Sequence, residues 1–238
     1  MRLGATLMSG PSMRRLSTTL CAAFILAALP SHAATIRRVS HTATLLTTGD
    51  VLITGGIDEL GNSLLSADIV ATSRGRAVTV ISSMGVKRSS HTATLMTNGC
   101  VLIAGGNSAA TDAVLPVPEI TAEIYNPATG LFTPTGSMTA GTARYNHTST
   151  LLNDGRVLIC GGQDNGGNAL FSCNLYTPTS CTAGAFTAAA PLLLGRFGHT
   201  ALLLKDGKVW FAGGANPAIT TTGSALTGTP GASRLPSG

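Results

Sequence analysis

The chain has 238 residues, enough for one or two ordinary domains, and its 29 glycines with only 11% charged residues suit a turn-rich all-β fold. The formal net charge is +5, but three of the fifteen Lys and Arg residues lie before residue 34, where no Asp or Glu occurs. The remaining twelve basic residues face ten acidic ones and are thinly spread. No basic stripe remains to release counterions from phosphates, so we exclude nucleic acid as a partner.

Residues 1–33 have the pattern of a secretory signal peptide. Arg14 and Arg15 precede an apolar core over residues 20–29, which is too short to span a bilayer as a helix. Ser31 and Ala33 supply small residues for cleavage after Ala33. A buried N-terminal helix is the alternative. The pattern predicts an exported protein, periplasmic or extracellular, with no membrane span after cleavage.

Met13 would be a natural start for such a signal peptide, which leaves residues 1–12 as a start-site extension. Behind the signal, residues 34–214 form the repeat region, and residues 215–238 form a tail. The tail is dominated by Ala, Thr, Gly, Ser and Pro, which cannot bury enough apolar surface to fold, so we expect it to be disordered.

One pattern occurs four times in the repeat region. An Arg is followed three residues later by His-Thr, and a Gly-Gly pair begins fourteen residues after that His. A fixed internal spacing with a period near fifty indicates a repeat fold. The repeated residues are Arg38, Arg88, Arg144 and Arg196; His41, His91, His147 and His199; and Gly55, Gly56, Gly105, Gly106, Gly161, Gly162, Gly213 and Gly214.

Each copy predicts a β-hairpin. The first strand is rich in β-branched residues, the turn ends in Gly, and the second strand is a short apolar run of the kind found in strands covered on both faces. Asn-Gly and Asp-Gly at the turns favour type I′ geometry. The first strands should cover about residues 41–46, 91–96, 147–152 and 199–204, and their partners about 51–54, 101–104, 157–160 and 209–212.

The fuller copies continue with a spaced Tyr and an aromatic residue, as in Tyr125 with Phe132 and Tyr176 with Phe186. An apolar strand, a double glycine and this spaced pair resemble the kelch repeat. The first copy departs, because Val70 stands where Tyr is expected, and Phe replaces the Trp that kelch blades usually carry. The resemblance covers about residues 36–216 and implies an all-β, kelch-type β-propeller similar to the central domain of galactose oxidase, with one four-stranded blade per repeat.

The fourth copy has its first hairpin but no recognisable outer strands after Gly214. The pattern therefore predicts about three and a half to four blades in an incomplete or open propeller. We favour a truncated or frame-shifted gene product over a closed ring of four blades. An open array exposes strand edges, which invites association.

The repeated side chains have a structural and a functional interpretation. One His per blade at the same position favours a structural, hydrogen-bonded role over a metal site, since ligand sets are normally asymmetric. The same reasoning covers the four Arg. The alternative follows from the resemblance, which places the start of the innermost strand near the mouth of the central channel. There Arg38, Arg88, Arg144 and Arg196 would form a ligand-binding ring for an anion or an acidic peptide.

Four cysteines follow the signal, and an exported chain meets oxidising conditions. Cys173 and Cys181 lie on a short hairpin-like stretch, so we predict a disulfide between them. Cys160 takes a slot held by small residues and is expected to be buried and unpaired. Cys100 takes a turn slot and is expected to be an exposed free thiol. No C-x-x-C occurs, which disfavours a zinc ribbon.

The loop after the second Gly-Gly pair, residues 107–120, is the longest, and long loops on repeat scaffolds commonly carry binding sites. A tolerated insertion is the alternative. We expect an exported propeller that binds a protein or carbohydrate ligand, with no catalytic residues, metal or cofactor. The other hypotheses are a non-functional fragment of a larger kelch protein and the remnant of a galactose oxidase-like oxidase. That oxidase chemistry needs a Cys–Tyr cross-link and a Tyr beside a His, and no Tyr-His dipeptide occurs among Tyr125, Tyr145 and Tyr176.

Overall fold

The computed structural model describes residues 37–72, 77–109 and 115–217. The predicted signal segment and most of the predicted tail lie outside these residues. Where the tail was expected to begin, Ala215 instead forms a β-bridge with Phe197, and the Asn216 side chain donates a hydrogen bond to the carbonyl of Gly195. The repeat region therefore continues slightly beyond the predicted boundary.

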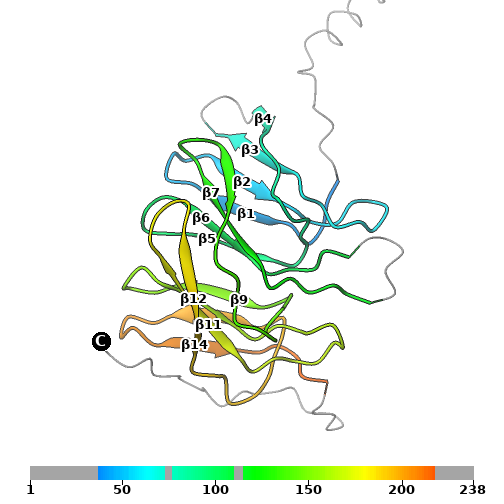
Figure 1. Cartoon of the computed structure of the whole chain (residues 1–238), viewed down its shortest axis with the longest axis vertical. Coiled ribbons are helices and arrows are strands. Elements are labelled where there is room, and N and C mark those ends of the chain that lie inside the picture. Colours follow the sequence, from blue (N-terminus) through cyan, green and yellow to red (C-terminus); the bar gives the residue numbers. More distant parts are fainter. Residues whose placement is uncertain (1–36, 73–76, 110–114, 218–238) are drawn as a thin grey trace, which may run out of the picture. The chain divides into compact units, whose positions relative to one another are not determined.

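The described residues form fourteen strands in four antiparallel sheets, one for each sequence repeat (Figure 1). Blade 1 contains β1 (Thr42–Leu45), β2 (Val51–Thr54), β3 (Ala67–Ala71) and β4 (Ala77–Val80). Blade 2 contains β5 (Thr92–Leu95), β6 (Val101–Ala104), β7 (Ala122–Asn126) and β8 (Leu131–Pro134). Blade 3 contains β9 (Thr148–Leu151), β10 (Val157–Cys160), β11 (Cys173–Pro178) and β12 (Gly184–Ala189). Blade 4 contains β13 (Thr200–Leu203) and β14 (Val209–Ala212).

Within each of blades 1 to 3 the strands pair in chain order, and in blade 4 the two strands pair with each other. All eight strands predicted for the four hairpins are confirmed, with the first strand of each hairpin shorter by one residue at each end. The described part of blade 4 has no outer strands, as the sequence predicted. Innermost strands of successive blades lie side by side, β1 with β5, β5 with β9, and β9 with β13.

The hairpin turns differ from the predicted type I′ geometry. In the first copy, the Gly49 N–H donates to Leu46, the Leu46 N–H donates to Asp50, and Gly49 has a φ of 87°. The residue before this glycine does not have positive φ. This is the three-residue loop in which a type I turn is followed by a left-handed glycine. The expected positive φ is confirmed at the turn glycine, but the type I′ prediction is wrong, because the residue before the glycine does not need positive φ.

The aromatic pair of each complete copy joins the two outer strands. Tyr125 lies directly opposite Phe132 across β7 and β8, with ring centroids 5.0 Å apart. Tyr176 lies opposite Phe186 across β11 and β12 at 4.7 Å. Val70 and Val78 occupy the matching places in blade 1, so β-branched residues replace the aromatic pair without loss of the strands.

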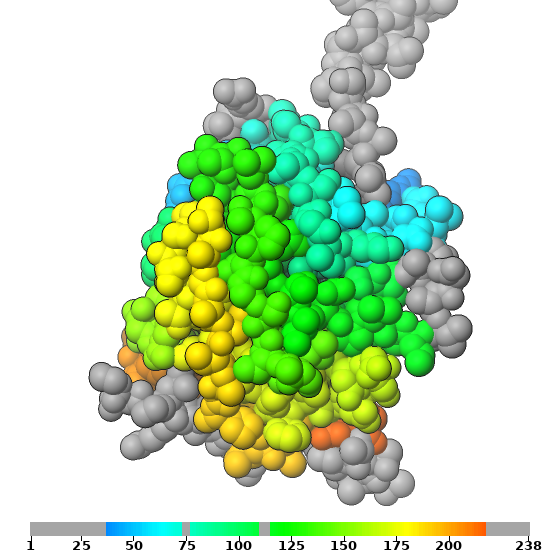
Figure 2. Space-filling view, in the orientation of Figure 1, coloured from blue at the N-terminus to red at the C-terminus, as the bar shows by residue number. Residues whose placement is uncertain are grey.

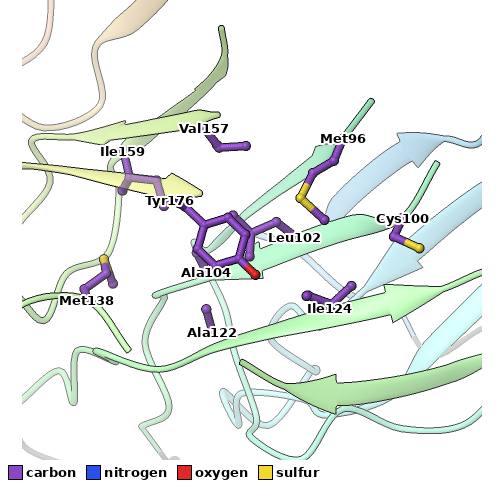
Figure 3. Packing of buried hydrophobic residues seen from close by; sticks show 10 residues of the cluster. All are labelled: Met96, Cys100, Leu102, Ala104, Ala122, Ile124, Met138, Val157, Ile159 and Tyr176. Atoms are coloured by element: carbon purple, nitrogen blue, oxygen red, sulfur yellow. The ribbon is translucent and has the colours of Figure 1, made fainter. Parts of the chain in front are cut away.

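The hydrophobic core lies between blades rather than within one. Figure 3 shows the cluster in which Leu102 and Ile124 of blade 2 pack with Val157, Ile159 and Tyr176 of blade 3. A similar cluster joins blade 1 to blade 2, and another joins blade 3 to blade 4. Strands β6 and β10 are buried along their whole length because they have a neighbour on each face. This explains why their sequences are continuously apolar.

Candidate functional site

A repeated set of contacts, which we call the blade seam, joins each blade to the next. The second glycine of a Gly-Gly pair donates its N–H to the carbonyl of the Arg in the next blade, at 2.8 Å each time. In blades 2 to 4, the residue before the repeat His donates its N–H to the carbonyl of the residue at the same position in the preceding blade, at 2.9 to 3.0 Å. The N–H donors of the first kind are Gly56, Gly106 and Gly162, and those of the second kind are Ser90, Asn146 and Gly198.

The first glycine of each pair makes room for the next blade. A Cβ added to Gly105 would lie 2.7 Å from Cε1 of His147 and 2.8 Å from the carbonyl oxygen of Arg144. Gly105 also has a φ of 62°, a conformation that L side chains rarely adopt. At Gly213, in blade 4, no atom of the described residues lies within 4 Å of an added Cβ. The glycine pair thus serves close packing between blades.

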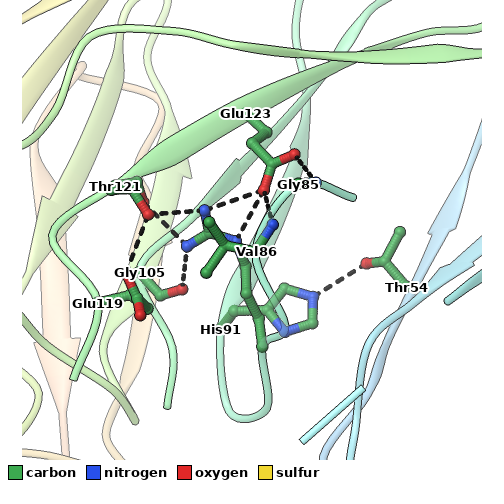
Figure 4. A network of polar contacts seen from close by, with 9 residues as sticks. Thr54, Gly85, Val86, His91, Gly105, Glu119, Thr121 and Glu123 are labelled. Atoms are coloured by element: carbon green, nitrogen blue, oxygen red, sulfur yellow. Dashed lines mark hydrogen bonds and ion pairs between the residues drawn. The ribbon is translucent and has the colours of Figure 1, made fainter. Parts of the chain in front are cut away.

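Each of three histidines reaches back across the seam. Nε2 of His91 lies 2.9 Å from the Thr54 hydroxyl, as Figure 4 shows, and 3.0 Å from the Thr42 hydroxyl. His147 and His199 contact Thr92 and Thr148 of their preceding blades at 3.0 and 2.8 Å. Burial lowers the pKa of His91 to about 3 and that of His199 to about 4, with a further lowering by the neighbouring arginine in each case. These rings are therefore neutral near pH 7, and their place in the seam is structural.

His41 is the fourth member and lies at the exposed edge of blade 1. No preceding blade lies against it among the described residues. The four histidines lie on four different blades, and the described residues contain no group of three or more His, Cys, Asp or Glu that could hold a metal ion.

For Arg88 and Arg144 the structure supports the favoured structural interpretation and contradicts the alternative of a ligand-binding ring at a channel mouth. Arg88 and Arg144 are fully buried. Arg88 donates to the carbonyls of Gly105 and Thr121, and Arg144 donates to those of Gly161 and Ser172. Each guanidinium thus joins the end of its blade's second strand to the start of the third, because a buried cation needs all of its donors satisfied. These two side chains have no surface left for a ligand.

The other two arginines repeat this arrangement at the ends of the described array. Arg38 donates to Gly55 and Ser66 and forms an ion pair of 2.6 Å with Asp68. Among the described residues, Arg196 donates to Gly213, and its Nε is buried without a hydrogen-bond partner. The sequence had already favoured a structural role for the arginines, because they recur once per blade at a constant spacing from the glycine pair.

Blade 2 adds a buried carboxylate to this arrangement (Figure 4). Glu123 accepts hydrogen bonds from the N–H groups of Gly85 and Val86, and its Oε1 lies 3.1 Å from Nη2 of Arg88. Burial lowers the pKa of Arg88, while the charges of Glu123 and Glu119 oppose that shift. Blade 3 has Asn174 at the position of Glu123, and burial lowers the pKa of its Arg144 to about 10.

The cysteine pairing differs from the prediction. The structure contains disulfides Cys100–Cys181 and Cys160–Cys173, in place of Cys173–Cys181. Cys160 and Cys173 lie opposite each other in the register of β10 and β11, so their pairing follows from the strand alignment. Cys100 is buried, and its bond to Cys181 connects the first hairpin of blade 2 with the outer hairpin of blade 3. A contact between blades cannot be seen in hairpin spacing.

Both tyrosines of the outer strands are structural. Tyr125 and Tyr176 are buried, and the Tyr176 hydroxyl hydrogen-bonds the Thr135 hydroxyl at 2.8 Å. Burial raises the pKa of both phenols. Tyr145 forms a backbone bridge with Gln163 beside its seam. All four cysteines of the described residues are paired as disulfides.

A cavity of about 490 Å³ lies among three loop segments that follow or precede the seam. Pro116, Val117 and Pro118 come from the long loop of blade 2, while Gly141 and Ala143 come from the connection to blade 3. Asp164 and Asn165 come from the loop of blade 3. In Figure 2 the green surface of blade 2 adjoins the yellow-green surface of blade 3. The long loop, for which the sequence suggested a binding role, thus contributes to a concave surface.

Hydrogen bonds within the loops hold the cavity walls. Oδ1 of Asn107 accepts from the N–H groups of Ala109 and Val117, which closes the long loop at its base. Oδ1 of Asp164 accepts from the N–H groups of Gly166 and Asn168. Partial burial alone would raise the pKa of Asp164, but hydrogen bonds from Asn168 and Gly166 outweigh it and hold the pKa below its ordinary value. The rim carboxylate is therefore charged at neutral pH.

Comparison with solved structures identifies the fold. The structure of YjhT superposes with a TM-score of 0.61 at 14% sequence identity, covering 75% of this chain and 59% of that chain. The fold is an all-β propeller, with three four-stranded blades and a two-stranded fourth in the described residues. At this identity the likeness concerns the fold alone.

A second similar structure is a novel fungal alcohol oxidase of the AA5 family in complex with copper. Its TM-score is 0.44 at 15% identity, with 75% of this chain and 47% of that chain covered. This likeness carries no argument about chemistry. The chain spans less than two thirds of either protein's length. No protein-family model and no curated protein matches the sequence.

Proposed function

We propose that this protein is an exported kelch-type propeller module that binds a protein ligand in the cavity between the loops of blades 2 and 3, without catalysing a reaction. The cavity carries the proposal, because three chain segments converge there and its size is in the range of ligand pockets. Loops on a rigid β scaffold are the usual place for recognition.

The lining favours a peptide segment over a sugar. Two prolines and Val117, which is 48% exposed, form an apolar wall, and the neighbouring Leu115 is 63% exposed. Asp164 and Asn165 provide polar groups on the other side. The described lining contains no aromatic ring on which a sugar could stack. An apolar side chain flanked by backbone N–H donors would match this combination.

Two observations support export. The two disulfides are the kind of cross-link that persists in oxidising compartments. The N-terminal sequence has the pattern of a signal peptide. None of the described residues belongs to a helix that is long and apolar enough to cross a membrane.

The absence of catalysis is part of the proposal and rests on what the reactive side chains do. Three of the four repeat histidines contact threonines across the seams, and the described cysteines are paired. Glu123 and Asp68 are paired with buried arginines. The alternative of an oxidase remnant would need a tyrosine free to take part in chemistry, and Tyr125 and Tyr176 are buried between strands.

The test is selection of peptides from a displayed random library, followed by measurement of their affinity for variants. Ala143→Trp fills the cavity, and Ala128→Trp adds the same side chain to an exposed hairpin turn of blade 2. Ala143→Trp should weaken binding at least tenfold, whereas Ala128→Trp should leave it unchanged. Equal binding by both variants would show that the cavity is not the site. Binding to a glycan array that only Ala143→Trp abolishes would keep the site but replace the ligand class.

A further inference from the structure

We propose that two copies of this chain associate head to tail, with the open face of blade 1 in one copy packing on the open face of blade 4 in the other. The two faces are opposite halves of the interface that the chain itself builds three times, between blades 1 and 2, 2 and 3, and 3 and 4.

The open face of blade 1 has the residues that blades 2 and 3 bury against their preceding neighbour. Leu45 and Ile53 occupy the places of Leu95 and Ile103, which pack in the cluster between blades 1 and 2. Leu45 is 62% exposed, and Ile53 is only partly buried. The apolar side chains are thus in position on blade 1, and no blade covers them in the described chain.

The open face of blade 4 is the matching surface. Leu202 and Trp210 pair across β13 and β14 and occupy the places of Thr94 and Leu102, which face blade 3 from blade 2. Leu202 is 57% exposed and Trp210 is 39% exposed, whereas Leu102 is buried. By contrast, Val209 and Phe211 on the other face of β14 are buried against blade 3. One side of this strand is therefore covered and the other is open.

The seam contacts are also left half-made at both ends. His41 is exposed on blade 1, while Thr200 is exposed on blade 4 in the place that Thr148 holds against His199. Gly213 has a φ of 67°, and no heavy atom of the described residues lies within 4 Å of a Cβ added to it. At the equivalent Gly55, Gly105 and Gly161, an added Cβ would lie less than 3 Å from an atom of the next blade. Among the described residues, the Gly214 N–H donates no hydrogen bond. Its equivalents in blades 1 to 3 donate to the carbonyl of the repeat Arg in the next blade. The corresponding carbonyl on the open face of blade 1 is that of Arg38.

These features indicate that the partner of the open face of blade 4 is a second copy of this chain. The Gly-Gly pair, the open Leu202–Trp210 surface and the free Thr200 require a partner with an Arg carbonyl, a His and two apolar side chains at blade spacing. Blade 1 of another copy presents that set in its own register. Such a contact joins two different patches, so it is heterologous, and each copy can use both of its faces.

The experiment uses two variants that each block one face. Leu45→Glu blocks the face of blade 1, and Leu202→Glu blocks that of blade 4. Leu131→Glu, at an exposed position of the outer strand β8, is the matched control. Mass from light scattering should show assembly for the wild type and for Leu131→Glu. It should show single chains for Leu45→Glu and for Leu202→Glu when each is alone.

Mixing the two blocked variants gives the decisive result. Leu45→Glu retains an intact blade 4 and Leu202→Glu an intact blade 1, so an equal mixture should form a dimer and nothing larger. Trp210 is the only tryptophan of the chain, and its emission should shift to the blue by several nanometres on mixing. A wild type that stays a single chain at every concentration would overturn the proposal. Assembly by Leu45→Glu alone would do so too, since it would indicate contact between two like faces.

Discussion

Blades 2 and 4 begin with the same kind of hairpin, yet they differ in how it is buried. All four residues of β6 in blade 2 are buried, whereas β14 in blade 4 alternates between buried and exposed. Both hairpins have the same register and the same left-handed turn glycine. The difference teaches that strand conformation is encoded locally, while stability comes from the neighbour on each face. Gly105 and Gly213 show the same contrast at the seam.

The largest test of this comparison removes the covalent link between the interior blades. Replacing Cys100 and Cys181 with Ser should lower the free energy of unfolding by about 4.5 kcal/mol, from the chain entropy of a long closed loop. Replacing Cys160 and Cys173 should cost less, about 3 kcal/mol, since their loop is short. Urea unfolding under oxidising conditions measures both. Equal losses would mean that loop closure is not the source of the stabilisation.

A second test breaks the equivalent Arg–carboxylate ion pairs of two blades, one fully buried in blade 2 and one more accessible in blade 1. Glu123→Ala leaves the buried Arg88 without its carboxylate and should cost about 4 kcal/mol. Asp68→Ala does the same to Arg38 in blade 1, where both side chains retain some exposure, and should cost about half as much. Denaturant titration of the two variants provides the ratio. A larger loss for Asp68→Ala would reverse our ranking of interior and terminal blades.

A third test uses the glycines of the seam. Gly105→Ala places a Cβ against His147 and the Arg144 carbonyl and should cost about 3 kcal/mol, from overpacking plus a left-handed backbone. Gly213→Ala meets no atom of the described residues within 4 Å and should cost only the backbone strain, about 1 kcal/mol. Thermal unfolding of the dilute, single-chain protein is the measurement. If the two losses are equal, the close approach of the next blade is not what selects glycine.

The last test concerns pH, and its effect per pH unit is small. An unfolded histidine protonates below about pH 6.5, but His91 and His199 keep folded pKa values of about 3 and 4. The unfolded state therefore binds more protons over this range, and stability falls as pH falls, by about 1.4 kcal/mol per pH unit for each ring. His91→Gln should remove its share of the slope between pH 6.5 and about 3, and His199→Gln between pH 6.5 and about 4. Unchanged slopes would show that these rings are protonated in the folded state.

Much of the fold was predictable because its signals are local and repeated. The turn glycines, the apolar runs and the glycine pairs were enough to predict all eight hairpin strands. Sequence reasoning failed for the cysteines. It missed the pairing of Cys100 with Cys181, which crosses between blades and which one repeat read alone does not display, and it expected Cys160 to be unpaired although the strand register places it opposite Cys173. For the buried arginines of blades 2 and 3 the favoured structural interpretation was right, and the alternative of a ligand-binding channel mouth was wrong.

The candidate site was predictable only in part. The length of the loop after Gly106 pointed to residues 107–120, and Pro116 to Pro118 line the cavity. The opposite wall, with Ala143 and Asp164, comes from segments whose composition is ordinary. Which loops face one another depends on how successive blades pack, and a spacing pattern contains no such information.

The bond between Cys100 and Cys181 also determines how the chain responds to a pulling force. Tension applied at the two termini passes through this cross-link, so residues 101–180 stay shielded from the load, and the shorter bond between Cys160 and Cys173 lies inside that shielded part. Reduction would release up to about 280 Å of hidden contour length, at about 3.5 Å per residue. The oxidised chain therefore has a shorter extensible contour length than the reduced chain, and the redox state of this disulfide sets how far the protein can extend under force.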